Sequence, residues 1–344
     1  MKLTALRRIV AVTAVLLWSP VAASQTFKLA TIAPENSVWM KDMRAGAREI
    51  EERTEGRVKI KFYSGGVQGN NNQVRRKMRI GQLHGGAFTS TALTGFQQDS
   101  ALYSLPLLFS TMDEVTYVRK HLDAELRRRL EDAGYVNFGF SGAGFGFLLS
   151  NKPMSTLADL DRQKIWVPAG DQPSYAALKA LGVSPVTMPM TDVLTGLQTD
   201  LLDSVSTSPV GALVLQWHTK VRYITDLPLS YVYGALIIDR KSFSRIQADD
   251  QAVFREIMEA IYTQFDEASI ADNEDAMQAL LKSGLKLVPP DVGQLPRWRE
   301  LVSASNHKMA DQGVFSAELL GQLTSHLEIY RSEAVAEAGT EESQ

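Results

Sequence analysis

The residue types that most often carry chemistry are sparse and scattered along this 344-residue chain. It has no Cys and five His (His84, His121, His218, His307 and His326). No two of these His residues have the i, i+4 or zinc-type spacing of a metal site. The members of a Ser-His-Asp triad need not be close in sequence, but no segment indicates one. The sequence therefore predicts no metal, no cofactor and no enzymatic activity.

A glycine-rich segment, GFSGAGFGF at residues 139–147, has a composition found in nucleotide-binding loops. It lacks the G-x-G-x-x-G order, no helix is expected directly after it, and Ser141 is not in a G-x-S-x-G motif. Glycine within a strand commonly marks the close approach of a backbone or a ligand. Two interpretations stay open for Phe140, Phe145 and Phe147, which either line a ligand cleft or pack in the core.

The elements that must position such residues alternate between strand and helix along residues 157–209. The apolar run at 164–167 predicts a strand, and the helical spacing at 175–181 predicts a helix that ends at a glycine. Residues 183–188 predict another strand, and Thr191 is a plausible N-cap of the next helix. This alternation is typical of an α/β domain, which binds ligands beyond the carboxyl ends of its strands.

The C-terminal part of the chain is mainly helical in pattern. From Asp249 a helical signal continues nearly to Ser283, longer than the about 25 residues that globular helices rarely exceed. Two further helices are expected near 292–312 and 316–335. We expect the mostly polar tail, residues 336–344, to be disordered.

The N-terminus and the charge balance predict an exported protein. Residues 1–24 combine a positive start (Lys2, Arg7 and Arg8), an apolar run and a small-residue exit, which predicts a signal peptide cleaved near Ser24. An uncleaved anchor helix is the alternative interpretation, although the run is shorter than the about 20 residues that span a bilayer. Cleavage removes three cations and no acid, so the net charge changes from −3 to −6. We expect a periplasmic protein without a nucleic-acid partner.

Several segments resemble the solute-binding subunit of tripartite ATP-independent periplasmic (TRAP) transporters, of the dicarboxylate-binding type. They are EERTEGRVKIKFY (51–63), LPLLF (105–109), KIWVP (164–168), LKALGVSPVTMP (178–189) and VLTGLQTDLLD (193–203). The resemblance extends over nearly the whole mature chain. It implies a two-lobed α/β fold, with two mixed sheets flanked by helices and one long helix that spans both lobes.

The resemblance also implies domain boundaries and a mode of action. Lobe I is expected to comprise residues 25–138 and 226–260, and lobe II residues 139–225 and 261–335. In such receptors the lobes close on one ligand in the cleft between them. The closed form then docks on the small and large membrane subunits of a TRAP permease, which an ion gradient drives. One branch of the family is thought to pair with a tetratricopeptide-repeat protein and to carry hydrophobic ligands.

The positions that grip a carboxylate differ from the usual family pattern. Where the family has an Arg after Lys-Ile this chain has Trp166, and where the family has G-F-R this chain has Gly146. Because a carboxylate buried without a cation costs several kcal/mol, we expect an apolar or weakly polar ligand. Two alternatives stay open: an organic acid gripped by other residues, and a carrier of hydrophobic molecules with a tetratricopeptide-repeat accessory protein. Trp166 itself either lines the cleft or is a core residue that fills the anion site.

The predicted ligand-binding residues combine motif position with side-chain chemistry. They are Trp39, Asn71, Ser90, Thr91, Phe145, Phe147, Trp166, Pro168, Thr207 and Tyr231. The basic side chains of the helix predicted at 74–80 are interpreted as a solvated face or, alternatively, as a docking surface for the permease.

Overall fold

The computed structural model describes residues 24–341. The predicted signal peptide therefore lies outside the described residues except for Ser24. The strands are β1 (Gln25–Ala30), β2 (Val58–Tyr63), β3 (Gly85–Thr89), β4 (Tyr135–Asn137), β5 (Ser141–Ser150), β6 (Trp166–Pro168), β7 (Val186–Met188), β8 (Ser204–Thr207), β9 (Tyr223–Asp239) and β10 (Lys286–Val288).

The α-helices are α1 (Val38–Arg53), α2 (Asn71–Arg79), α3 (Ser90–Leu93), α4 (Met112–Asp132), α5 (Leu157–Leu160), α6 (Gln172–Ala180), α7 (Val193–Gln198), α8 (Pro209–Val214), α9 (Arg240–Phe243), α10 (Ala248–Lys282), α11 (Leu295–Asp311) and α12 (Ala317–Glu341). Short 3-10 helices are η1 (Gln98–Ser104), η2 (Met190–Asp192) and η3 (Trp217–Lys220). Within residues 24–341 no helix is both long and apolar enough to span a membrane.

The larger of the two sheets is mixed and continues through both halves of the molecule. Its strand order is β2-β1-β3-β9-β5-β8, and β4 and β10 each pair with β9. β1 is parallel to β2 and β3, whereas β9 is antiparallel to β3, β4 and β5. The second sheet contains the parallel strands β6 and β7. The α/β class and the mixed pairing are as predicted, but one sheet spans the molecule because β9 pairs with strands of both halves.

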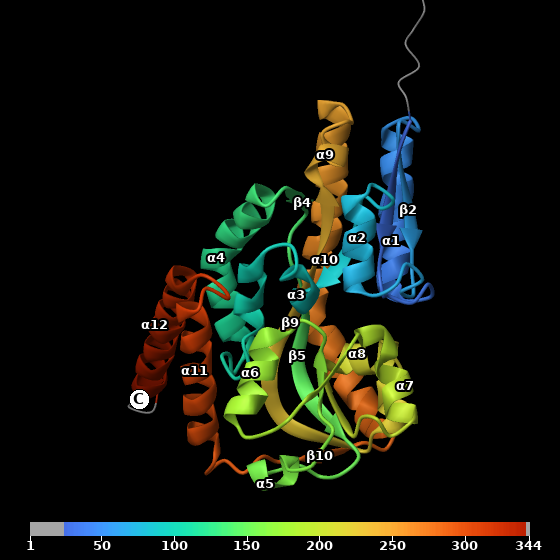
Figure 1. The fold of residues 1–344 in the computed structure, drawn as a ribbon. Helices are drawn as coiled ribbons and strands as arrows, with labels where there is room; N and C mark the ends of the chain where they lie inside the picture. Colours follow the sequence, from blue (N-terminus) through green and yellow to red (C-terminus); the bar gives the residue numbers. More distant parts are fainter. Residues whose placement is uncertain (1–23, 342–344) are drawn as a thin grey trace, which may run out of the picture.

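Two lobes are visible in Figure 1, one above the other. The upper lobe contains α1, α2, α4, β1 and β2, and the lower lobe contains α5, α6, α7 and α8. The strands β5 and β9 cross between them, and the 35-residue α10 passes behind both. Each lobe buries its own apolar cluster, around Phe27 and Phe254 in the upper lobe and around Trp217 and Val205 in the lower. The predicted long helix is thus present, while the lobe boundaries stay a prediction.

The two C-terminal helices lie along one side of both lobes. α11 contacts α6 of the lower lobe, and α12 contacts α4 of the upper lobe. α12 continues to Glu341, so residues 336–341 are helical where the sequence predicts a disordered tail. Ala and Glu, which make up much of this segment, are strong helix formers and favour the continued helix.

Candidate ligand-binding site

A cavity of about 180 Å³ lies between the two lobes. Most of the side chains around it are Leu, Ile, Val, Met, Pro and Trp, and the others are mainly Ser and Thr. We call it the apolar cavity. Its walls come from the upper lobe, the lower lobe, β9 and α11, and they include Thr91, Asp171, Leu178, Thr207, Tyr231 and Trp298.

Several polar groups of the apolar cavity lie at or just after strand ends. Thr89 ends β3 and is followed by Ser90 and Thr91 in α3, while Thr207 ends β8. Pro168 ends β6, and the turn after it leads to Asp171 and α6. These are carboxyl ends of strands, the edge at which α/β folds place their ligands.

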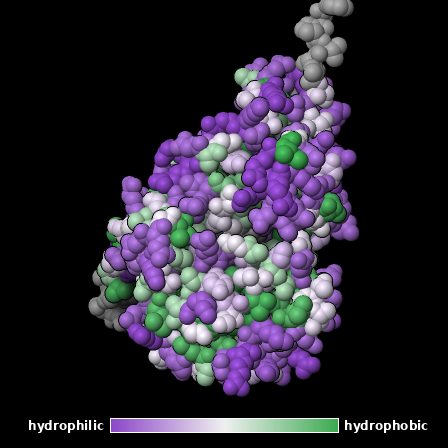
Figure 2. Space-filling model, in the orientation of Figure 1, coloured by the Kyte–Doolittle hydropathy of each residue, from purple (hydrophilic) through white to green (hydrophobic). Residues whose placement is uncertain are grey.

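The apolar part of the wall belongs to the packing of the lower lobe and of α11. Leu148 and Ile165 lie in a small core cluster against which Leu178 packs. Trp298 and Val302 of α11 complete the wall and are 6% and 1% exposed. On the face shown in Figure 2, hydrophobic residues gather over the lower lobe, whereas the upper lobe is mostly hydrophilic. The cavity is therefore continuous with the hydrophobic core that α11 covers.

Asp171 is the only Asp or Glu among the described residues that line the apolar cavity, and these residues include no Lys, Arg or His. Its Oδ1 atom accepts a hydrogen bond of 3.0 Å from the Ser174 backbone N–H. Its Oδ2 atom lies 3.5 Å from Oγ1 of Thr91, across the lobe interface. Burial raises the pKa of the Asp171 carboxyl, because removing water penalises the charged form.

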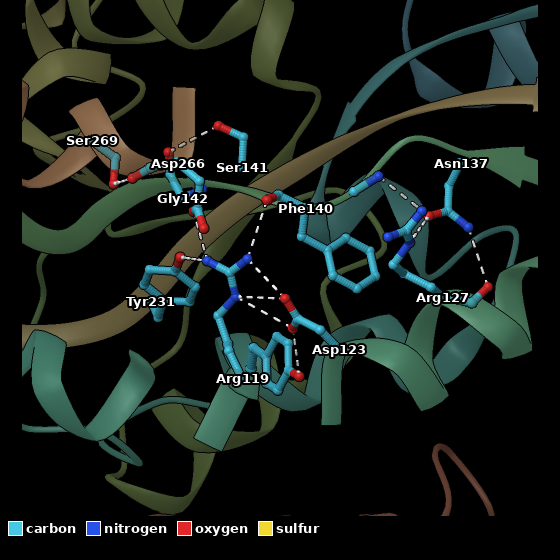
Figure 3. A network of polar contacts seen from close by, with 12 residues as sticks. Arg119, Asp123, Arg127, Asn137, Phe140, Ser141, Gly142, Tyr231, Asp266 and Ser269 are labelled. Carbon is cyan, nitrogen blue, oxygen red and sulfur yellow. Dashed lines mark hydrogen bonds and ion pairs between the residues drawn. The ribbon is translucent and has the colours of Figure 1, made fainter. Parts of the chain in front are cut away.

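Tyr231, another wall residue, is held by a buried ion network at the crossing strands. Its hydroxyl oxygen accepts a hydrogen bond of 2.9 Å from Nη1 of Arg119. The same guanidinium pairs with Asp266 at 2.6 Å and Asp123 at 2.9 Å, and donates to the Phe140 carbonyl (Figure 3). Burial raises the pKa of Tyr231 to about 12. The Arg119 charge is thus committed to partners within the protein.

A second cavity of about 210 Å³ adjoins the first and shares Thr91 with it. We call it the polar cavity. It lies among the first residues of α2, α3 and α6, where Asn71, Asn72 and Gln172 contribute to its wall. Arg75 also lines it, with its guanidinium carbon 5.8 Å from the centroid of the Phe96 ring. This cavity, unlike the apolar one, presents a cation.

The structure brings most of the predicted ligand-binding residues together. Six line the apolar cavity: Ser90, Thr91, Trp166, Pro168, Thr207 and Tyr231. Asn71 lines the polar cavity. The ligand roles of these residues stay predictions. Most of them lie close together because they are at or near strand ends that meet at the cavity.

Three predicted residues line neither cavity. Trp39 of α1 stacks on Phe265 of α10, with ring centroids 6.0 Å apart. Phe145 and Phe147 lie on the same face of β5 because side chains alternate along a strand, and both pack against core clusters. The opposite face carries Gly146, where a side chain would approach the cavity residue Ser206. Phe145 and Phe147 therefore pack as the core interpretation predicts, and their ligand role stays a prediction.

Trp166 is both a core residue and part of the cavity wall. It is 3% exposed, and its Nε1 atom donates a hydrogen bond of 3.0 Å to the Met188 carbonyl. Its ring lies edge-on to Trp217, with centroids 5.2 Å apart. Both open interpretations of this residue thus apply, because the indole fills the lobe core on one side and borders the cavity on the other.

Several wall residues were not predicted from the sequence. Asp171 has a local signal, because an Asp three residues before Ser174 is a typical N-cap arrangement. Leu178 was expected on a buried helix face, but not in a cavity wall. Trp298 and Val302 have no local signal, because only the tertiary contact of α11 with α6 brings them to the site.

Comparisons with known proteins agree with this architecture. The family model described as bacterial extracellular solute-binding protein, family 7 (DctP), matches residues 29–312. The C4-dicarboxylate-binding periplasmic protein DctP of Rhodobacter capsulatus is 21% identical over 277 residues, which cover 78% of this chain and 82% of that protein.

Solved structures show the same fold. The sugar acid binding protein DctPAm from Advenella mimigardefordensis, in complex with galactonate, has a TM-score of 0.81 at 18% identity, covering 89% of this chain and 98% of that chain. A TRAP periplasmic solute binding protein from Haemophilus influenzae with bound L-gulonate has a TM-score of 0.80 at 17% identity, covering 88% and 100%.

Proposed function

Because the chain belongs to the DctP family of TRAP solute-binding proteins, we propose that its solute is an apolar or weakly polar molecule bound in the apolar cavity. Members of this family are periplasmic solute receptors rather than enzymes, and they work with membrane permease subunits. The family assignment does not determine the solute class, so we infer it from the residues that line the cavity.

The observation that carries the proposal is the absence of any Lys, Arg or His among the described residues of the cavity wall. A micromolar affinity corresponds to about −8 kcal/mol. Burying a carboxylate without a cation costs several kcal/mol, which would remove much of that affinity. Apolar surface, in contrast, contributes roughly 25 cal/mol for each Å² removed from water. The wall therefore favours a solute that is bound through its apolar surface.

The position of the cavity supports binding by closure of the lobes. Thr91 belongs to the upper lobe and Asp171 to the lower, and their side chains approach across the interface. Hinge motion of β5, β9 and α10 would open this interface and release the solute. Closure would bury the solute and leave the outer surfaces of both lobes free to dock on the permease.

The test is to identify what the protein carries. We would purify it from its native periplasm, record native mass spectra, and extract the bound molecule under denaturing conditions. The expected result is a small apolar or weakly polar compound. Recovery of a dicarboxylate or sugar acid that rebinds the purified protein would overturn the proposed solute class, while the family assignment would stand.

A second candidate is an organic acid gripped by Arg75 in the polar cavity. The ligands named for similar structures, galactonate and L-gulonate, are carboxylates. Arg75 lines the polar cavity and is half-buried, so its guanidinium could pair with a carboxylate there. If an organic acid is recovered, Arg75→Ala should abolish its rebinding, whereas an apolar solute should be insensitive to this change.

Three partner and location hypotheses remain for experiment. Cleavage near Ser24 is checked by N-terminal sequencing of the exported protein. Docking on the small and large permease subunits, and on the predicted tetratricopeptide-repeat accessory protein, is checked by affinity purification with solute present and after its removal. The expected partner of the solute-bound form is the permease.

A further inference from the structure

The structural role of Asp171 uses only one of its two carboxylate oxygens. Oδ1 accepts from the Ser174 backbone N–H and so caps the first turn of α6. Oδ2 accepts only a long hydrogen bond from the Thr91 hydroxyl, at the 3.5 Å limit, and the Ser174 hydroxyl also interacts with the carboxyl group. An ionised carboxylate has about four acceptor sites, so Oδ2 retains acceptor capacity.

Asp171 lies at the wall between the two cavities. The residues on either side of it, Gly170 and Gln172, line the polar cavity, whereas Asp171 and Ser174 line the apolar one. The described residues that line the apolar cavity with Asp171 include no Lys, Arg or His that could pair with its carboxyl group. A carboxylate whose acceptor sites are only partly used is costly to enclose in a cavity, so a bound molecule that supplies a further donor reduces that cost.

The inference about Asp171 rests on the proposed function and makes the solute class more specific. We propose that Asp171 is the polar recognition group of the apolar cavity, and that the solute presents a hydrogen-bond donor, either an ammonium or a hydroxyl group, to Oδ2. The apolar part of the solute lies along Leu178, Leu181 and Trp298. A carboxylate in the same position would be repelled by Asp171 and would meet no cation.

Three probe molecules separate the possible end groups. 2-Phenylethylamine, 2-phenylethanol and phenylacetate each contain eight carbons and one benzene ring, but end in an ammonium, a hydroxyl and a carboxylate. A cavity of roughly 150 Å³ in another protein accommodates benzene, so one ring suits a cavity of about 180 Å³. Binding of each probe to the purified, delipidated protein is measured by isothermal titration calorimetry. We expect the amine or the alcohol to bind at least about tenfold more tightly than the acid.

Two variants test whether Asp171 is responsible. Asp171→Asn keeps an oxygen for the helix cap but replaces the second acceptor with an amide donor. Asp171→Ser keeps a capping oxygen and removes the carboxylate. Both should weaken binding of the preferred probe by about tenfold or more, because hydrogen bonds to charged groups contribute most. Thermal denaturation of each variant verifies that the fold is retained.

Asp239→Asn is the matched control. Asp239 caps α9 through the Ser242 backbone N–H at 2.9 Å, in the same Asp-x-x-Ser arrangement, but lines neither cavity. It should lose a similar amount of stability and leave probe binding unchanged. A binding loss shared by Asp239→Asn would show that helix capping, not recognition, is responsible.

The outcomes distinguish the proposed solute class from the proposed role of Asp171. If the wild-type protein prefers phenylacetate, or binds none of the probes at millimolar concentration, the proposed solute class is wrong. If it prefers the amine or the alcohol but both Asp171 variants bind as tightly as the wild type, only the role of Asp171 is wrong. Stronger phenylacetate binding by Asp171→Asn than by the wild type would confirm that the carboxylate repels anions.

Discussion

The apolar and polar cavities share Thr91 and both lie where α3 faces the start of α6, but they are built from different residues. Walls of the apolar cavity, such as Trp166 and Tyr231, are nearly inaccessible and belong to core clusters. Walls of the polar cavity, such as Asn72 and Gln172, are exposed residues at helix starts.

Because of this difference, substitutions in the apolar cavity should affect both solute binding and stability. Substitutions in the polar cavity should affect stability much less. An apolar-cavity residue that also fills a lobe core, such as Trp166, should change both properties when it is replaced. An exposed residue of the polar cavity, such as Asn72 or Gln172, can be replaced with little effect on folding. The following predictions test this contrast, from the largest expected effect to the smallest.

Trp166→Ala should reduce the free energy of unfolding by about 3–5 kcal/mol, because it removes a buried indole that packs on Trp217. Urea denaturation of the solute-free protein measures the loss. The control is Asn71→Ala in the polar cavity, which should change stability by less than about 0.5 kcal/mol. Similar losses in the two variants would contradict the contrast between the cavities.

Tyr231→Phe should reduce the free energy of unfolding by about 1–3 kcal/mol, because its hydroxyl accepts a hydrogen bond from the buried Arg119 charge. Tyr233→Phe is the matched control: Tyr233 stacks on Tyr231, but its hydroxyl donates to the neutral Ser100 carbonyl. Thermal and urea denaturation compare the two variants. A larger loss for Tyr233→Phe would show that the ion network does not anchor the cavity wall.

Gly146→Arg should strengthen phenylacetate binding by about tenfold, because it introduces a cation beside the cavity residue Ser206. A Cβ atom at this position would lie 3.1 Å from Oγ of Ser206, so the hydroxyl must shift slightly. Titration calorimetry measures the gain, and Gly146→Gln controls for side-chain bulk. The double variant with Trp166→Arg should lose stability in addition, since Trp166 is a core residue. If neither variant gains affinity for a carboxylate, the missing arginines do not explain the solute class.

Arg75→Ala should have the smallest effect. Arg75 is half-buried and contacts the Phe96 ring, so we expect a stability change within about 0.5–1 kcal/mol. Binding of 2-phenylethylamine and 2-phenylethanol should be unchanged. Titration of the wild type and the variant in parallel checks this, and a large loss of affinity would show that the polar cavity, not the apolar one, binds the solute.

Much of the fold could be predicted from the sequence. The long helical pattern after Asp249 became α10, and the predicted strand–helix alternation became β6, α6, β7 and α7, while the strand β8 that follows was not predicted. Periodicity reports such elements because it depends on residues close together in sequence. It did not reveal that β9 joins the sheets of the two lobes, because strand pairing depends on residues far apart in the chain.

Most of the predicted site residues line one of the two cavities. The wall residues that were not predicted include those that only tertiary packing brings to the site. Thr91, Pro168 and Thr207 were predicted from motif position and side-chain chemistry, and in the structure they lie at or just after the carboxyl ends of strands. Phe145 and Phe147 were predicted either to line a ligand cleft or to pack in the core, and the alternation of β5 directs both toward core clusters. Which face of a strand meets a cavity depends on the register of its partners, and no local pattern contains that information.

The sequence by itself determined the α/β alternation and the family resemblance, and it predicts that Trp166 and Gly146 stand where the family usually has clamp arginines. These are properties of residue type and local spacing. The tertiary structure decided that Trp166 also fills a lobe core, that α11 completes the cavity wall, and that Asp171 faces Thr91 across the lobes. Such contacts form only when distant segments pack together, because burial is a property of the whole fold.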